Sequence, residues 1–184
     1  PKTLVSAKTY MVVTANPYAS KAGCEILKKG GSAVDAAVAV QAVLGLVEPQ
    51  SSGLGGGAFM LHYDAKTRKV QSYDGRETAP AAATEDYLRT ISASNPAAPL
   101  PIPAGTAPES GGAFNALRQS GRSVGTPGAV RMLELAHKDY GNLAWKDLFQ
   151  AGTQLATDGF PISGRMAAAI DGSRTLLFTD PEAA

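Results

Sequence analysis

One short run, Asp74-Gly75-Arg76-Glu77-Thr78-Ala79-Pro80, contains the side chain best suited to binding chemistry. The guanidinium of Arg76 is a planar fork of donors that can hold a carboxylate through two parallel hydrogen bonds, which a lysine cannot do. Upstream lies the glycine loop, residues 51–57 (Ser-Ser-Gly-Leu-Gly-Gly-Gly), whose backbone can approach another segment or a ligand closely. Together they predict a pocket for a small carboxylate-bearing substrate.

Both features also fit plainer interpretations. Asp74 and Glu77 flank Arg76, so an ordinary surface salt bridge is an alternative role for this arginine. Residues 53–58 match the dinucleotide pattern G-x-G-x-x-G/A, but that pattern needs a strand before the loop and a helix after it. Here the predicted order is helix, loop, strand, which excludes the nucleotide interpretation and leaves a tight helix-to-strand connection as the alternative to a binding loop.

The remaining candidates for chemistry are predicted to be structural. Cys24 is the single cysteine, so the chain has no internal disulfide, and its helical surroundings favour a core thiol over a nucleophile. His62 and His137 are isolated and lack metal-ligand spacing, so we expect both to be structural. No catalytic residue and no metal ligand is therefore predicted, and Arg76 is the one candidate binding residue.

The bulk composition is that of a globular protein able to form one domain. The 184 residues carry 17 basic and 16 acidic side chains, a formal charge of +1 that is mixed along the chain. This balance provides no footprint for nucleic acid or for an anionic membrane surface. No apolar run is long enough to predict a membrane span, and no signal-peptide core is present in these residues.

The N-terminal half is predicted to form the elements that position the glycine loop. Residues 10–15 are expected to be a buried strand, closed by Asn16 as the cap of a helix that ends before Gly30. Ser32 and Asp35 form the pattern of a capping box at the start of a second helix, which extends to about residue 46. That helix is apolar nearly all round, which predicts a central and fully buried position.

The segments around Arg76 are predicted to be strands. Residues 58–64 and 69–74 are predicted to form two strands, and the short connection between them favours an antiparallel hairpin. A short helix is expected to start at Thr84, with Glu85 and Asp86 in its first turn. Residues 91–112 are rich in Pro, Ala, Ser and Gly, which predicts a flexible loop.

The C-terminal third is predicted to be helical. Thr126-Pro127 is expected to cap one helix that ends at Gly141-Asn142, a second spans about 144–157, and a third starts after Ser163. Helices combined with an antiparallel hairpin favour an α+β architecture over a doubly wound sheet.

Several collinear motifs resemble those of the γ-glutamyltranspeptidases. The match extends over essentially the whole chain except residues 91–112, and its motifs lie at 19–23, 26–39, 47–49, 51–59, 76–80, 123–128 and 155–161. This resemblance implies that residues 1–184 are one incomplete domain, the N-terminal part of the large subunit. The fold it implies is part of a four-layer αββα N-terminal-nucleophile hydrolase.

The resemblance also implies a reaction. Such precursors cleave themselves into a large and a small subunit, which frees a threonine nucleophile at the start of the small one. The γ-glutamyl group of glutathione or a related donor passes to that threonine and then to water or an amine, with no cofactor. Arg76 stands where the family's arginine binds the α-carboxylate of the donor. The implied partners are the rest of the large subunit and the small subunit, and the implied location is periplasmic or secreted.

Two departures qualify what the resemblance implies. Nothing in this chain resembles the threonine nucleophile, so the chain alone is expected to be a non-catalytic fragment. The apolar helix at 33–46 needs cover on every side, and the implied fold draws some of it from the absent subunit, so we also expect an exposed apolar patch or self-association. Many members also carry an aromatic residue where this chain has Gly75. The Asp-Gly-Arg-Glu form resembles the branch that includes cephalosporin acylases, which cleave a glutaryl-type side chain, and this keeps an acylase as the alternative function.

Overall fold

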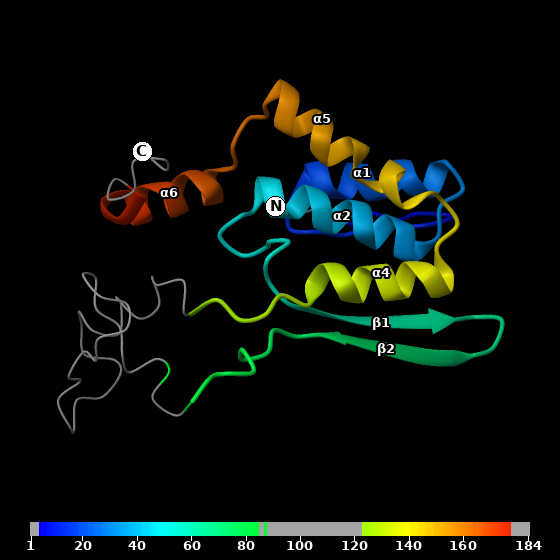
Figure 1. The fold of residues 1–184 in the computed structure, drawn as a ribbon. Coiled ribbons are helices and arrows are strands. Elements are labelled where there is room, and N and C mark those ends of the chain that lie inside the picture. Colours follow the sequence, from blue (N-terminus) through cyan, green and yellow to red (C-terminus); the bar gives the residue numbers. More distant parts are fainter. Residues whose placement is uncertain (1–3, 85–86, 88–122, 178–184) are drawn as a thin grey trace.

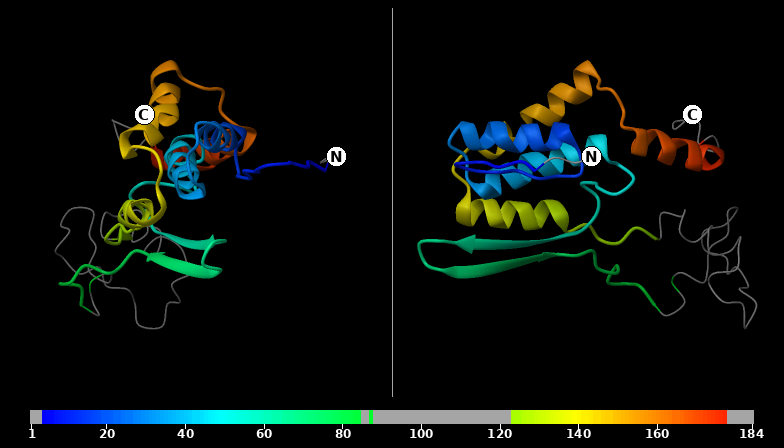
Figure 2. Two further views of the ribbon diagram at one scale, coloured as in Figure 1. Left: turned by 90° about the vertical axis from the view of Figure 1, so that its right-hand side faces the viewer. Right: turned by 180° about the vertical axis from the view of Figure 1, so that it is seen from behind.

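The structure is a computed structural model that describes residues 4–84, 87 and 123–177 (Figure 1). Its helices and strands follow one another along the chain as α1 Pro17–Lys28, α2 Ala33–Val47, β1 Ala58–Asp64, β2 Lys69–Gly75, α4 Ala129–Tyr140, the 3-10 helix η2 Trp145–Phe149, α5 Gln150–Asp158 and α6 Gly164–Leu177. Helix α4 lies between the β1–β2 hairpin on one side and the other helices on the other (Figures 1 and 2). The predicted α+β class is confirmed.

The first two helices begin where local side chains satisfy their free backbone donors. Asn16 caps α1 by accepting a hydrogen bond from Tyr18 N (3.0 Å), and Pro17 occupies the first helical position. Ser32 and Asp35 form the predicted reciprocal capping box, in which each side chain accepts a bond from the other's backbone N–H. After α1, Gly30 adopts a positive φ of 87°, which is why a glycine ends that helix well.

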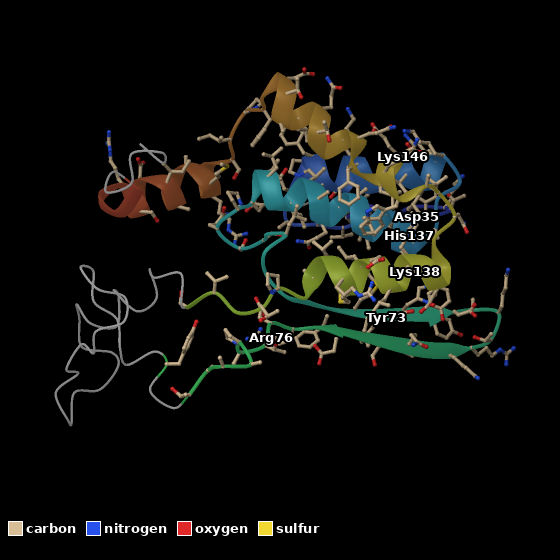
Figure 3. The ribbon with its side chains drawn as sticks, in the orientation of Figure 1. Asp35, Tyr73, Arg76, His137, Lys138 and Lys146 are labelled. Atoms are coloured by element: carbon tan, nitrogen blue, oxygen red, sulfur yellow. The ribbon has the colours of Figure 1, made fainter. Side chains whose placement is uncertain are left out.

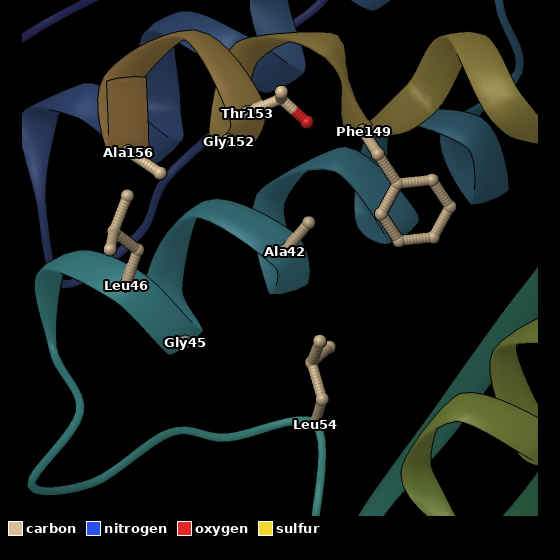
Figure 4. A pocket seen from close by; sticks show the side chains of 8 residues that line it. All are labelled: Ala42, Gly45, Leu46, Leu54, Phe149, Gly152, Thr153 and Ala156. Atoms are coloured by element: carbon tan, nitrogen blue, oxygen red, sulfur yellow. The ribbon is translucent and has the colours of Figure 1, made fainter. Parts of the chain in front are cut away.

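Helix α2 is central, but it is not buried on every side as the sequence predicted. Val34, Val38, Val43 and Val47 are at most 2% exposed, with α1, α4, η2 and α5 packed around them. Ala33 is exposed, and Ala42 and Gly45 border an open apolar pocket that faces α5 and the glycine loop (Figure 4). The sequence of α2 is apolar on all sides, whereas the elements packed around the helix leave one of its sides partly open.

The hairpin has the predicted strands and direction. β1 and β2 pair antiparallel from Ala58↔Gly75 to Asp64↔Lys69, joined by residues 65–68. Tyr73 points toward α4, where its hydroxyl donates to Asp139 Oδ2 (2.6 Å), and burial followed by this bond raises the pKa of Tyr73 well above its usual range. This bond, together with the buried Met132 beneath the sheet, fixes the hairpin on α4.

The predicted strand at residues 10–15 is wrong. These residues have no strand assignment and no ladder partner among the described segments, and Met11 and Val13 are exposed (50% and 82%). Val12 does point inward, since its methyl groups lie in the space that a Cβ on Gly23 would need (2.9 Å). The short β-branched run favours an extended backbone, but a strand also requires a neighbouring chain to pair with.

The C-terminal helices agree with the prediction except at their starts. Gly128, not Thr126, occupies the N-cap of α4, while Thr126 pairs with Thr78 in an isolated bridge. The single helix predicted over 144–157 is divided into η2 and α5, and α6 begins after Ser163 as expected. The helix predicted from Thr84 and the loop predicted at 91–112 fall almost entirely outside the described residues.

Candidate substrate-binding site

Arg76 lies immediately beyond the last residue of β2, where the sequence placed it (Figure 3). Its backbone N–H donates a hydrogen bond to Asp74 Oδ1 (2.9 Å). The side chain is 70% exposed. It is therefore free to meet a ligand.

Main-chain hydrogen bonds hold three separate segments together around this arginine. The carbonyl oxygen of Gly56, in the glycine loop, accepts bonds from Gly128 N (3.3 Å) and Ala129 N (3.1 Å) at the start of α4. Thr78 and Thr126 exchange two backbone bonds, of 2.8 and 3.4 Å. The glycine loop, the end of β2 and the start of α4 are thus held together by hydrogen bonds between their backbones.

Gly75 is required where β2 meets α4. A Cβ added at this position would lie 2.6 Å from Met132 Cβ, 2.9 Å from the Gly128 carbonyl oxygen and 3.1 Å from that of Ala58. Two of these three obstacles are backbone atoms, which cannot move aside cheaply. An aromatic side chain at this position would therefore require a different approach of α4 to the hairpin.

A pocket of about 340 Å³ borders Arg76. Its lining comes from the end of β2, Tyr87 and the segment before α4, and consists of Arg76, Glu77, Thr78, Ala79, Pro80, Tyr87, Ser123, Val124 and Gly125. A second pocket of similar size also includes Glu77, and the rest of its mainly polar lining comes from Gln41 of α2, the residues after α2 and the glycine loop. Glu77 is the residue common to both linings.

Among the residues that the structure describes, the guanidinium of Arg76 is paired at its Nε edge. Its Nε lies 3.6 Å from Glu77 Oε2, so the salt-bridge interpretation describes part of its environment. Within the described ranges no other carboxylate pairs with this guanidinium. The edge that carries the two terminal nitrogens can bind a carboxylate in the bidentate mode. The salt bridge and the carboxylate-binding role are therefore compatible.

Comparison with known proteins shows the family of this chain. The family model for gamma-glutamyltranspeptidase matches residues 19–184. The chain belongs to this family. It is 41% identical over 163 residues to the glutathione hydrolase proenzyme of Bacillus subtilis, which covers 89% of this chain and 25% of that protein. Glutathione hydrolase 3 of Arabidopsis thaliana is 33% identical over 178 residues, covering 97% of this chain and 24% of that protein.

Solved structures of gamma-glutamyltranspeptidases share the fold. The Helicobacter pylori gamma-glutamyltranspeptidase has a TM-score of 0.77 at 27% identity, covering 98% of this chain and 47% of that chain. The cephalosporin acylase from Bacillus halodurans has a TM-score of 0.68 at 26% identity, covering 95% of this chain and 31% of that chain. These neighbours confirm the predicted assignment to the N-terminal-nucleophile hydrolase fold. The chain spans about a quarter of the length of the curated relatives it matches.

The other polar residues considered for chemistry have structural surroundings in this gamma-glutamyltranspeptidase chain. The ring of His62 lies against Tyr140 with centroids 3.9 Å apart. Nε2 of His137 donates to the Leu143 carbonyl oxygen (2.9 Å) and lies 3.4 Å from Asp35 Oδ1. Cys24 is a half-buried residue of α1. Where the chain is described, no group of three His, Cys, Asp or Glu residues could hold a metal ion.

The structure adds residues to the site that sequence reasoning did not assign. Ser123, Val124 and Gly125 line the Arg76 pocket although they are distant in sequence, and Glu77 separates the two pockets. The family motif at 123–128 was visible in the sequence, but only the pairing of Thr78 with Thr126 shows which segment it adjoins. None of the helices in the described residues is long and apolar enough to cross a membrane.

Proposed function

We propose that the complete protein transfers the γ-glutamyl group of glutathione or a related donor to water or to an amine, and that Arg76 binds the α-carboxylate of the donor. The observation that carries this proposal is the half-engaged guanidinium at the edge of a pocket, in a chain of this family. Relatives named glutathione hydrolases support the choice of donor.

In this proposal the nucleophile is a threonine outside these 184 residues. It becomes the first residue of a small subunit when the precursor cleaves itself, and its own α-amine serves as the base. The name of the Bacillus subtilis relative, a proenzyme, supports such processing. The partners of this chain are then the rest of the large subunit and the small subunit, the location is periplasmic or secreted, and the chain by itself turns nothing over.

The test is the substitution Arg76→Ala in the complete, cleaved protein. Loss of a bidentate, charge-assisted pair is worth roughly 1.5–3 kcal/mol, so we expect the donor KM to rise about ten- to 150-fold while kcat changes much less. Arg76→Lys should recover only part of the loss, because a lysine cannot make two parallel bonds. Arg131→Ala, on the exposed side of α4, is the matched control and should keep the normal KM. An unchanged KM in Arg76→Ala would exclude the carboxylate-binding role.

A glutaryl-cephalosporin acylase is the second candidate. It is favoured by Gly75, which gives the Asp-Gly-Arg-Glu form, and by the structural likeness to the Bacillus halodurans cephalosporin acylase. The terminal carboxylate of a glutaryl side chain would fit the same guanidinium, so Arg76 does not distinguish the two substrates. A donor panel of glutathione, glutamine and a glutaryl-cephalosporin does. Turnover of the cephalosporin alone would replace the first proposal by the second.

A further inference from the structure

We propose that Glu77 is the residue that positions Arg76, by holding the Nε edge of the guanidinium so that its terminal nitrogens face the pocket. This inference rests on the proposed function, since it assigns a role to Glu77 only if Arg76 binds the donor. The side chain of Glu77 is 33% exposed, and its Oε2 lies 3.6 Å from Arg76 Nε. It forms part of the wall between the two pockets.

The position of the Glu77 side chain is set by glycines. A Cβ added to Gly57 would lie 2.7 Å from Glu77 Cδ and 2.9 Å from Glu77 N, so an alanine there would collide with the carboxylate group. A Cβ added to Gly125 would lie 2.8 Å from Glu77 Cβ. Glu77 therefore occupies the space that side chains at 57 and 125 would fill, between the glycine loop and the segment before α4.

A fixed carboxylate matters because the arginine is otherwise loosely held. Arg76 is 70% exposed, and long side chains lose rotamer freedom when a ligand immobilises them. A partner that already restrains the Nε edge lowers this loss and leaves the other edge available for a bidentate pair. Glu77 also balances the charge of the guanidinium when no donor is bound. Its role is thus to preorganise Arg76 without contacting the donor.

The first test is a double-mutant cycle in the complete, cleaved protein. Glu77→Gln keeps the shape of the side chain but removes its charge, and we expect the donor KM to rise roughly two- to five-fold with kcat nearly unchanged. In an Arg76→Ala background the same substitution should have no further effect, because Glu77 acts through Arg76. Glu134→Gln, on the exposed side of α4, is the control for loss of a surface carboxylate and should leave the KM unchanged.

The second test displaces the carboxylate without changing it. Gly57→Ala should reproduce the KM effect of Glu77→Gln. Gly172→Ala should not, since a Cβ at Gly172 meets nothing within 4 Å and that residue lies outside both pockets and the glycine loop. An anilide donor whose α-carboxylate is converted to an amide lacks the group that Arg76 is proposed to bind. It therefore distinguishes loss of Arg76 positioning from general damage to the fold. Its weaker turnover should be insensitive to Glu77→Gln, whereas a structural defect would lower the turnover of both donors.

The outcomes separate the two proposals. If Arg76→Ala leaves the KM unchanged, the proposed function fails and this inference fails with it. If Arg76→Ala raises the KM but Glu77→Gln does not, or if the two effects multiply independently in the double variant, only the positioning role of Glu77 is overturned. If Gly57→Ala yields uncleaved or unfolded protein, the Glu77→Gln cycle decides by itself.

Discussion

Replacement of Asp35 by alanine should destabilise the contact between the start of α2 and the α4–η2 connection. The side chain is fully buried (Figure 3). Its Oδ2 accepts hydrogen bonds from the backbone N–H groups of Ser32 (2.8 Å), Asn142 (2.9 Å) and Leu143 (3.2 Å), and its Oδ1 lies 3.4 Å from His137 Nε2. The carboxylate thus joins residues that are more than a hundred positions apart.

The magnitude follows from the donors that the substitution leaves unsatisfied. A buried donor without a partner costs about 1–3 kcal/mol, and the three donors here are partly buried, so we place each near the lower limit. Because these hydrogen bonds are also charge-assisted, we expect the free energy of unfolding to fall by about 3–5 kcal/mol in total, as for a broken buried ion pair. Asp35→Asn retains one acceptor oxygen and should lose less.

Hydrogen exchange measured by mass spectrometry on the complete protein provides a local assay. A loss of about 3 kcal/mol corresponds to exchange that is roughly 150-fold faster at the Asn142 and Leu143 amides. Ser32→Ala is the matched control, because it removes only the hydroxyl that accepts from Asp35 N and should cost about 1 kcal/mol without affecting those two amides. The reasoning is refuted if Asp35→Ala leaves their protection intact, or if the control exposes them equally.

Two further predictions concern residues outside this contact. The hydrogen bond from Asn16 to Glu48, followed by the Gln50 bond and the charge of Arg165, holds the pKa of Glu48 below its ordinary 4.5. Glu48 therefore stabilises the fold fully above pH 4.5, and this stabilisation is lost as the pH falls through the lowered pKa. The acid unfolding curves of the wild type and of Glu48→Gln should therefore converge at low pH. Curves that stay parallel throughout would contradict this. Gly75→Ala should lower the free energy of unfolding by about 1–3 kcal/mol, because the added Cβ is overpacked against Met132 and Gly128. Gly172→Ala is the control and should not destabilise the protein, because a Cβ there meets nothing within 4 Å. Equal melting temperatures for the two variants would disprove the close packing at Gly75.

The parts of the fold that were predictable from the sequence are those that depend on neighbours in the chain. Asn16, Ser32 and Asp35 act through backbone groups two or three residues away, so their types and spacing were sufficient to locate two helix starts. The bonds from Asp35 to residues 142 and 143 were not predictable, because no local pattern marks an acceptor as shared with a distant turn. The same limit applies to Thr126, whose expected capping role is replaced by a bridge to Thr78.

For the candidate site, the sequence indicated the binding group but not its surroundings. The chemistry of Arg76 and the family motifs pointed to a carboxylate, and that assignment stays a prediction until the variants are measured. The pocket walls come from segments that only the folded chain brings together, namely the end of β2 and residues 123–125. In the sequence, Glu77 was a competing salt-bridge partner and so argued against a binding role for Arg76. In the structure, Glu77 lies between Gly57 and Gly125 and is part of the same candidate site as Arg76.

The apolar surface of the chain lies mainly where the sequence did not predict it. Exposure was expected around α2, because that helix is apolar on all sides, yet its buried valines are covered and its apolar opening is the partly open pocket at Ala42, Gly45 and Leu46. The far face of the hairpin is more exposed, with Phe59, Leu61, Tyr63 and Val70 each at least 60% accessible. Period-two alternation places these side chains opposite the face that packs on α4. Since β1 carries apolar residues on both faces, it has the pattern of a strand buried between two layers.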